Sequence, residues 1–139
     1  MTVSGDFLDE LNDNHLYRTM GIRVTRTGDG WAESELTPQG SVCWPFPDQP
    51  HGGVLFTLMD TTMAWSVFTL LDQGQNCTTI DLNIHYAKPA RNGPFRCRAD
   101  VGQRTGKLAF IRAQITDADD NILAMGQGAF RVINIDPFA

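Results

Sequence analysis

Cysteine is scarce in this chain and poorly placed for cross-linking or metal binding. The 139 residues include three cysteines, Cys43, Cys77 and Cys97, which are far apart and contain no Cys-x-x-Cys pair. Disulfide-rich domains and structural zinc sites depend on paired or clustered cysteines. We therefore expect neither a disulfide framework nor a structural zinc, and a reducing cytoplasm is the expected compartment.

Runs of basic residues are also missing. Eleven Lys and Arg stand against 16 Asp and Glu, which gives a formal net charge of −5. Binding to the phosphates of nucleic acids depends on clusters of Lys and Arg, so we expect no nucleic-acid partner. The first ten residues lack the basic start and apolar centre of a secretory signal, which again favours the cytoplasm.

The rest of the composition is ordinary for one globular domain. Apolar residues make up 42% of the chain and charged residues 19%, and a chain of this length buries about two-thirds of its unfolded surface. We expect residues 1–139 to form a single domain of the α+β class. The pattern predicts an N-terminal helix within residues 1–20, two strands within 21–36, a proline-rich loop at 37–50, a central helix at 52–72, and strands at 78–86, 95–104, 108–116 and 122–133.

The central helix is the most informative segment. Residues 52–71 are apolar on nearly every side of a helix, apart from five hydroxyl side chains and a single acid, Asp60. Such a helix is either the core of a soluble protein or a membrane span. The hydroxyls, the leading glycines and the central acid favour the core, so we expect no membrane association.

Two features of this segment suggest chemistry. Asp60 must point into a cavity or have a partner, because a buried unpaired charge is costly; a local cap or a buried Arg would satisfy it equally well. The turn His51-Gly52-Gly53 allows a ligand to approach the backbone closely, and free N–H groups of the first helical turn can bind an oxyanion or a carbonyl oxygen. The same turn also serves simply to start a helix.

The spacing of these features predicts the assembly. Gly52 and Asp60 are eight residues apart, about 12 Å along a helix axis, so they cannot reach one acyl carbon from the same helix. If they cooperate, the acid comes from a second subunit. An enzymatic interpretation therefore predicts a two-fold dimer with sites across its interface.

Strict alternation marks the strand at 78–86. Ile80, Leu82, Ile84 and Tyr86 are expected on one face, and Thr79, Asp81, Asn83 and His85 on the other. His85 is expected to be a hydrogen-bonded interface residue, with Asp81 and Asn83 at the surface or in a dimer contact.

Four stretches, taken in order, carry a family resemblance: HGGVLFTLMDTTMAW, TTIDLNIHYAKPA, GQRTGKLAFIRAQI and AMGQGAFRVI. The chain resembles the hotdog-fold acyl-CoA thioesterases, and within them it looks most like the phenylacetate-pathway (PaaI-type) subgroup. The resemblance covers residues 21–133, and the ordered set is more specific than any one motif. It implies a hotdog fold, in which an antiparallel sheet wraps around one long central helix.

The resemblance also implies roles for particular residues. The family motif HGG-x6-D falls on His51, Gly52, Gly53 and Asp60. The family uses the acid as nucleophile or general base, and the amide of the first glycine polarises the thioester carbonyl. A family Ser or Thr opposite the acid falls on Thr79, where it would orient water or the carboxylate.

The expected substrate-binding residues lie around this motif. The turn at 106–110 resembles the segment that lines the pantetheine tunnel, and residues 88–91 are expected near the nucleotide. Several relatives carry Asn or Gln shortly before HGG; residues 43–49 contain no Asn, and Gln49 and Asp48 are the candidates to replace it. The full substrate-binding set is Gly53, Trp44, Phe46, Gln49, Lys88, Arg91, Gly106, Lys107 and Leu108.

Together these features predict an acyl-CoA thioesterase that releases a free acid and CoA. The aromatic residues near the motif favour a medium-chain or aromatic acyl group. Coenzyme A enters as part of the substrate, no metal or redox cofactor is expected, and the protein is expected to be a dimer or a dimer of dimers. Two alternatives remain: a non-catalytic acyl-CoA-binding hotdog protein, and a hotdog dehydratase or isomerase acting on acyl thioesters.

Overall fold

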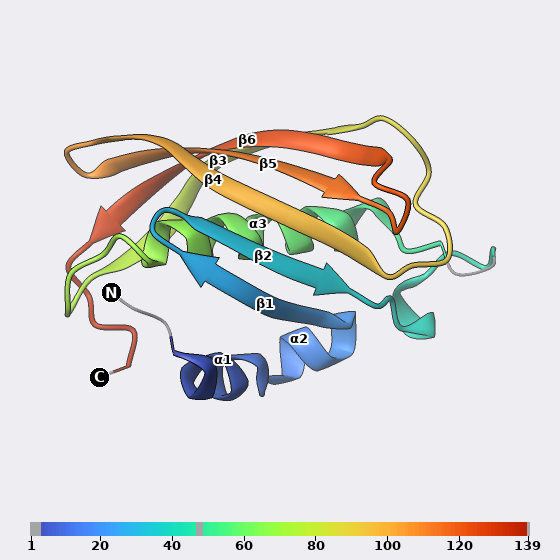
Figure 1. Ribbon diagram of the computed structural model, residues 1–139, viewed down its shortest axis with the longest axis horizontal. Coiled ribbons are helices and arrows are strands. Elements are labelled where there is room, and N and C mark those ends of the chain that lie inside the picture. The colour runs from blue at the N-terminus through green and yellow to red at the C-terminus, as the bar shows by residue number, and fades with distance from the viewer. Residues whose placement is uncertain (1–3, 47–48, 139) are drawn as a thin grey trace.

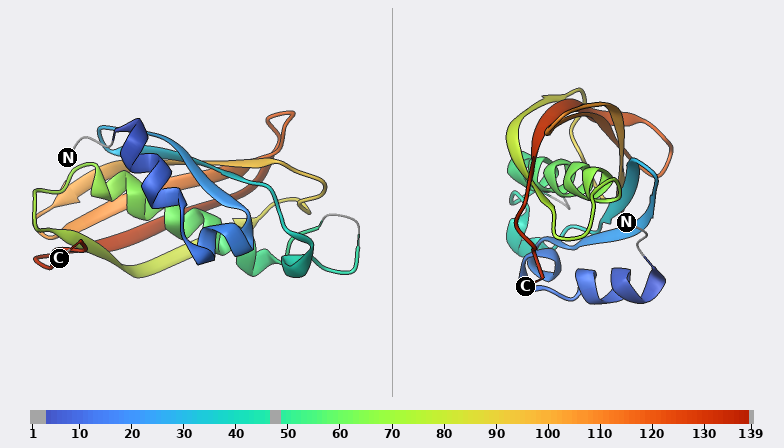
Figure 2. Two further views of the ribbon diagram at one scale, coloured as in Figure 1. Left: turned by 90° about the horizontal axis from the view of Figure 1, so that it is seen from below. Right: turned by 90° about the vertical axis from the view of Figure 1, so that its left-hand side faces the viewer.

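One curved sheet encloses one long helix. The computed structural model describes residues 4–46 and 49–138, and its six antiparallel strands follow the order β1-β2-β4-β5-β6-β3 (Figure 1). Seen end-on, the sheet curls around α3 (Figure 2). The expected α+β arrangement is therefore confirmed. β1 and β3, at opposite ends of the strand order, form the edges of the sheet.

The strands follow the expected segments closely. β1 (Ile22–Gly28) and β2 (Trp31–Leu36) form a hairpin, and β4 (Phe95–Thr105), β5 (Leu108–Thr116) and β6 (Ile122–Ile133) form a meander. β3 (Asn76–Tyr86) begins two residues earlier than predicted and pairs with β6. A 3-10 helix, η1 (Gly40–Val42), interrupts the proline-rich loop.

The N-terminal segment differs from the single helix expected within residues 1–20. It forms α1 (Gly5–Asn12) and α2 (His15–Met20), because Asn14 caps the second helix by accepting the N–H of Tyr17 at 2.9 Å. Asn side chains compete for backbone hydrogen bonds and so favour caps over helix interiors. The buried Asn12 then bonds both the N–H and the C=O of Val24, at 2.8 and 2.9 Å, which ties α1 to β1.

α3 (Gly52–Phe68) is four residues shorter than the helix expected at 52–72. Beyond Phe68 the N–H groups of Leu70 and Leu71 reach back three residues instead of four. The Arg104 guanidinium of β4 donates to the Leu70 carbonyl at 2.8 Å. The chain therefore leaves α3 through a tightened turn, and Arg104 holds the carbonyl that follows it.

Two glycines of β6 let α3 lie directly on the sheet. A Cβ at Gly126 would stand 2.5 Å from the sulfur of Met59 and 2.5 Å from the backbone oxygen of Asn83. At Gly128, a Cβ would stand 2.7 Å from the sulfur of Met63. Both methionines are completely buried, so the missing side chains of the strand make room for those of the helix.

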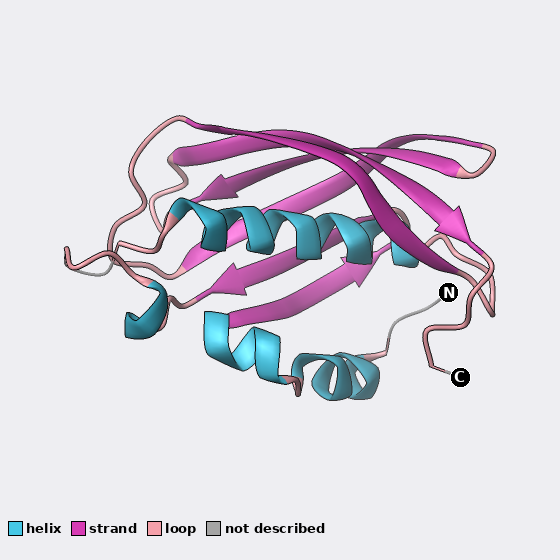
Figure 3. Cartoon of the chain, turned by 180° about the vertical axis from the view of Figure 1, so that it is seen from behind, coloured by secondary structure: helices cyan, strands magenta, loops and turns pink. Residues whose placement is uncertain are grey.

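Among the described residues nothing fully covers one side of α3, contrary to the expectation of a helix buried on every side. Phe56 is 37% exposed, and the other members of this side are half-buried. From behind, most of α3 is seen in front of the strands of the sheet (Figure 3). We call this side the open strip; it consists of Phe56, Thr57, Asp60, Thr61 and Ala64.

The contact between α3 and β6 predicts a stability defect. Gly126→Ala should lower the free energy of unfolding by about 1–3 kcal/mol, the usual effect of overpacking a core, because neither the Asn83 backbone nor the buried sulfur can easily move. Thermal unfolding of the variant and of Gly40→Ala, where a Cβ meets nothing within 4 Å, would measure the difference. Equal melting temperatures would contradict the close contact.

Candidate active site

A β-bulge in β3 decides which of its side chains face α3. The pairing with β6 shifts between Thr79 and Asp81, so Ile80 is the extra residue and its side chain is 54% exposed. A bulge reverses the alternation that follows it. The predicted alternation was therefore wrong at this point: Thr79 faces α3, on the same side of the sheet as Leu82 and Tyr86.

This geometry brings Thr79 to the single acid of α3. The Thr79 hydroxyl donates to Asp60 Oδ1 at 2.7 Å, while the Asp60 side chain is half-buried on the open strip. No ion pair involves Asp60 among the described residues. Among the described residues Asp60 is therefore neither a helix cap nor the partner of a buried Arg: a hydroxyl of β3 holds one of its carboxylate oxygens.

Cys77, a potential nucleophile, lies on β3 two residues before Thr79. Its thiol donates to the carbonyl of Ala64 at 3.6 Å. Burial raises the pKa of Cys77 to about 11, and the negative charge of Asp60 adds to this effect. The thiol therefore stays protonated at neutral pH and is a poor nucleophile.

The start of α3 forms a second group of candidate residues. His51 caps the helix, and its Nδ1 accepts the N–H of Gly53 at 2.8 Å. Gly52 is the first helical residue, so its N–H has no acceptor within the helix. The hydroxyl of Tyr86, at the end of β3, donates to the Gly52 carbonyl at 2.7 Å.

The proline-rich loop folds back beside this helix start. Cys43 and Pro50 form an isolated β-bridge, and the Trp44 ring lies 4.9 Å from the His51 ring between centroids. A pocket of about 330 Å³ opens there. Its lining includes Trp44, Gln49, Gly52, Tyr86 and Lys88.

Other predicted binding residues lie outside this pocket. Phe46 is 62% exposed and Arg91 is exposed, and neither lines the pocket. Asp48, one of the candidates to replace the missing Asn, lies outside the described residues. Trp44, Gln49 and Lys88 therefore lie together beside the helix start, whereas Phe46 and Arg91 lie apart from them, and the substrate-binding role of all five stays a prediction.

The turn at 106–108 lies near Thr79 instead. Leu108 pairs with Arg131, one residue from Phe130, which pairs with Thr79. Two strand spacings, about 10 Å, separate β5 from β3. Gly106 and Lys107 connect β4 to β5, and Lys107 accepts the N–H of Val132 at 2.7 Å.

The predicted residues therefore form two groups in a single chain. Asp60 and Thr79 lie midway along α3, with the 106–108 turn two strands away, while the His51-Gly52-Gly53 turn and its pocket lie at the helix start. Gly52 and Asp60 stay eight residues apart on one helix, about 12 Å along its axis. One chain alone does not bring the amide and the acid to one carbon atom.

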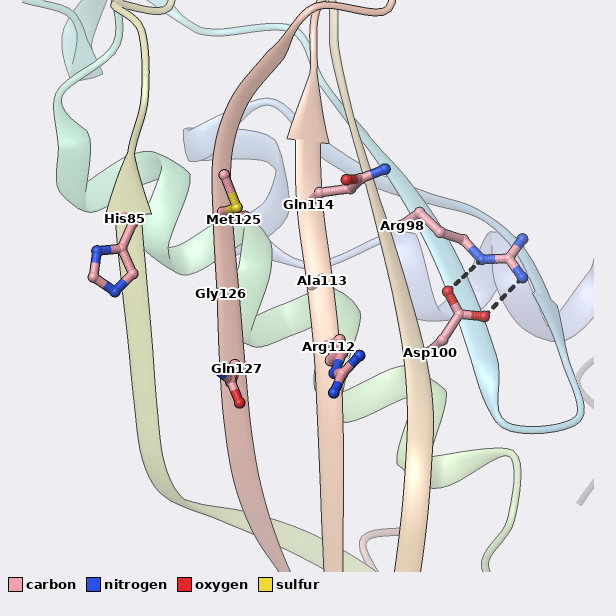
Figure 4. A pocket seen from close by; sticks show the side chains of 9 residues that line it. All are labelled: His85, Arg98, Asp100, Arg112, Ala113, Gln114, Met125, Gly126 and Gln127. Atoms are coloured by element: carbon pink, nitrogen blue, oxygen red, sulfur yellow. Dashed lines mark hydrogen bonds and ion pairs between the residues drawn. The ribbon is translucent and has the colours of Figure 1, made fainter.

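A separate groove lies on the outer face of the sheet. It measures about 410 Å³ and contains none of the predicted site residues. Figure 4 shows its polar lining, with Arg98 and Asp100 paired on β4 and His85 at the far side on β3. Asp81 and Asn83 line the neighbouring part of the same face. These three β3 residues therefore point away from Asp60.

The described residues contain neither a cluster of metal ligands nor a helix that could span a membrane. Among residues 4–46 and 49–138, no group of three His, Cys, Asp or Glu side chains is arranged to hold a metal ion. Within the same residues, none of the helices has both the length and the apolar character needed to cross a bilayer.

Comparison with known proteins identifies the family. A family model described as the Thioesterase superfamily matches residues 51–124, more than half of the chain. The chain belongs to the thioesterase superfamily. A relative in Halobacterium salinarum, named "Putative esterase", is 31% identical over 91% of this chain and 89% of its own length.

Solved structures agree with this assignment to the superfamily. A thioesterase of Haemophilus influenzae has a TM-score of 0.89 and 22% identity, covering 97% of this chain and 94% of its own. The PaaI protein of the E. coli phenylacetic acid degradation operon has a TM-score of 0.80 and 19% identity, covering 92% and 91%. At these identities the two show the shared fold, and the predicted hotdog fold is confirmed.

A third structure belongs to a protein of Bacillus halodurans that was solved with CoA. It is 32% identical, with a TM-score of 0.69, and the match covers 73% of this chain and 66% of the other. The superfamily match begins at His51 and contains Asp60 and Thr79.

Proposed function

We propose that this superfamily member hydrolyses the thioester of a medium-chain or aromatic acyl-CoA to a free acid and CoA. The observation that carries the proposal is the Asp60 carboxylate, held by Thr79 on the open strip of a helix that begins with Gly-Gly. A positioned carboxylate can act as the base or nucleophile of acyl transfer to water, and a helix N-terminus can bind the oxyanion.

The chemistry assigns one task to each group. The Gly52 N–H donates to the thioester carbonyl oxygen and stabilises the negative charge that develops there in the transition state. Asp60 either attacks the carbonyl carbon and expels the CoA thiolate, giving a mixed anhydride that water then opens, or takes a proton from the attacking water. Both routes consume one water and yield one acid and one CoA. Thr79 fixes the orientation of the carboxylate.

A complete site requires two subunits on this proposal. The open strip is a partly apolar helix side that nothing among the described residues fully covers, and it contains Asp60 and Phe56. A two-fold partner lying on it would bring the Gly52 of one chain near the Asp60 of the other. We therefore propose a dimer as the smallest active unit, or a dimer of dimers.

The remaining residues suggest how the substrate lies. Lys88 lines the pocket beside Gly52, and the exposed Arg91 follows three residues later, so both are proposed to face the phosphates of CoA. The Bacillus halodurans relative solved with CoA supports a CoA ligand for this chain as well. The 106–108 turn is proposed to contact the pantetheine arm. A cytoplasmic location and chemistry without a metal or redox cofactor remain predictions.

The carboxylate is tested directly by Asp60→Asn. Turnover of octanoyl-CoA or benzoyl-CoA should fall at least about 10²-fold, the usual contribution of a positioned base, because the amide still accepts from Thr79 but neither attacks nor takes a proton. Thiol release per folded protein measures the effect, with Asp29→Asn in the exposed β1–β2 turn as control. A folded Asp60→Asn protein with parental turnover excludes a catalytic Asp60; a parent that binds both acyl-CoAs but releases no thiol is a binding protein instead.

The two-subunit site is tested by complementation. Gly52→Pro removes the amide proton at a first helical position where Pro fits well, and the His51 backbone, at φ −58° and ψ 144°, suits a following Pro. Each of Gly52→Pro and Asp60→Asn should be inactive alone. Randomly mixed dimers should recover about a quarter of parental turnover per chain, since half of the dimers hold one intact site of two. No recovery in verified mixed dimers, or a fully active monomer in sedimentation, would rule out the shared site.

The Trp44 ring is expected to select the acyl group. It stacks on His51 and lines the pocket at the helix start, so Trp44→Ala should change the ranking of acyl-CoAs of different length and aromaticity more than it lowers the best turnover. The ratio kcat/KM over a panel of acyl-CoAs measures this. An unchanged ranking would make the ring a packing element of the loop.

A further inference from the structure

Tyr86 contacts the proposed carbonyl-binding turn although no motif singles it out. It is the last residue of β3, and its hydroxyl donates to the Gly52 carbonyl at 2.7 Å. Its ring lies against Gly52, since a Cβ at that position would stand 3.4 Å from the tyrosine Cζ. The side chain is nevertheless 50% exposed. Burial raises the pKa of Tyr86, so the hydroxyl remains a donor at neutral pH.

The hydrogen bond of Tyr86 is one of two that hold a single peptide group. The carbonyl of the Gly52–Gly53 peptide accepts from Tyr86, and the N–H of the same peptide donates to His51 Nδ1 at 2.8 Å. Both ends of this peptide plane are therefore fixed by side chains. Hydrogen bonds in such a chain polarise and strengthen one another. A neutral His51 that accepts at Nδ1 carries its proton on Nε2.

Two adjacent glycines make this anchoring necessary. Glycine has the widest range of backbone conformations, so the orientation of the Gly52 N–H is weakly determined by the local sequence. An oxyanion donor acts only when it is aimed in advance at the developing charge. His51 belongs to the turn itself, whereas Tyr86 comes from a different element and ties the turn to the sheet.

We propose that Tyr86 is a positioning residue that aims the Gly52 N–H at the thioester carbonyl by holding the carbonyl of the next peptide. The inference rests on the proposed function and extends it. The same strand carries Thr79 at its bulge, so β3 aligns two groups of the catalytic helix: the carboxylate at its middle through Thr79 and the amide at its start through Tyr86. Because Tyr86 is half-exposed, its hydroxyl is expected to affect the orientation of the Gly52 N–H more than the stability of the fold.

Tyr86→Phe tests the hydroxyl alone. We expect kcat to fall about 10-fold, less than the 10²–10³-fold loss of a whole oxyanion donor, with KM within about twofold and a nearly unchanged melting temperature, because an exposed hydrogen bond contributes little to stability. The control is Tyr17→Phe, at the only other tyrosine. The Tyr17 hydroxyl accepts from Trp65, about 20 Å along the helix axis from Gly52, so this variant should lose stability but keep kcat per folded protein.

A second variant and a second measurement separate the role of the Tyr86 hydroxyl from the packing of its ring. Tyr86→Leu should lower kcat at least as much as Tyr86→Phe; if only the Leu variant loses activity, ring packing is responsible and the inference fails. In the Asp60→Asn background, the infrared carbonyl stretch of bound ¹³C-labelled octanoyl-CoA should lie at lower frequency than in solution. Adding Tyr86→Phe should reverse part of that shift, and an unchanged frequency would overturn the inference.

These results separate the inference from the proposed function. A parent protein that hydrolyses neither octanoyl-CoA nor benzoyl-CoA overturns both. A parent that hydrolyses one of them, together with a Tyr86→Phe variant of parental kcat, overturns the role of Tyr86 and leaves the proposed function intact.

Discussion

The direct contact between α3 and the glycines of β6 determines how the other elements are placed. Because Gly126 and Gly128 present no side chains, Met59 and Met63 approach the sheet closely. The sheet can then curl around the helix and bury its other apolar residues. This contact also fixes the rotation of α3 about its axis. With the methionines against β6, Asp60 lies on the open strip, beside the edge strand that carries its partner.

The edge strand β3 supplies the side chains that hold Asp60 and Gly52 of α3. Without its bulge, the alternation of a regular strand would put Thr79 on the outer face with Asp81 and Asn83, and Asp60 would have no hydroxyl donor. A single extra residue reverses that direction before the strand resumes its regular pairing. The same strand ends at Tyr86, beside the start of the helix. The fold thus supplies two anchored candidate groups on one helix, about 12 Å apart, which is too far for one substrate carbon and is the basis of the proposed site shared by two chains.

Much of this could be predicted from the sequence because the relevant signals are local. The strand boundaries of the meander follow alternation and turn residues, and the long helix follows from its apolar run and its Gly-Gly start. The exceptions have physical reasons. The break between α1 and α2 depends on the cap that Asn14 makes, and the tightened turn that follows α3 is held by Arg104, distant in sequence, through the Leu70 carbonyl. A bulge at Ile80 cannot be recognised in a pattern of alternating residues, so the face of the sheet on which Thr79 lies was predicted wrongly from periodicity. Tyr86 was missed as a site residue because its importance lies in a contact between two elements.

The two methionines at the centre of the fold have a consequence for oxidative damage. Conversion of a thioether to a sulfoxide adds an oxygen atom and a strong dipole to the side chain. The sulfurs of Met59 and Met63 lie close against Gly126 and Gly128, and both methionine side chains are completely buried. Peroxide therefore reaches them only when the helix separates from the sheet, and once oxidised they hinder its return. Oxidation of Met59 or Met63 is therefore expected to require opening of the contact between α3 and the sheet.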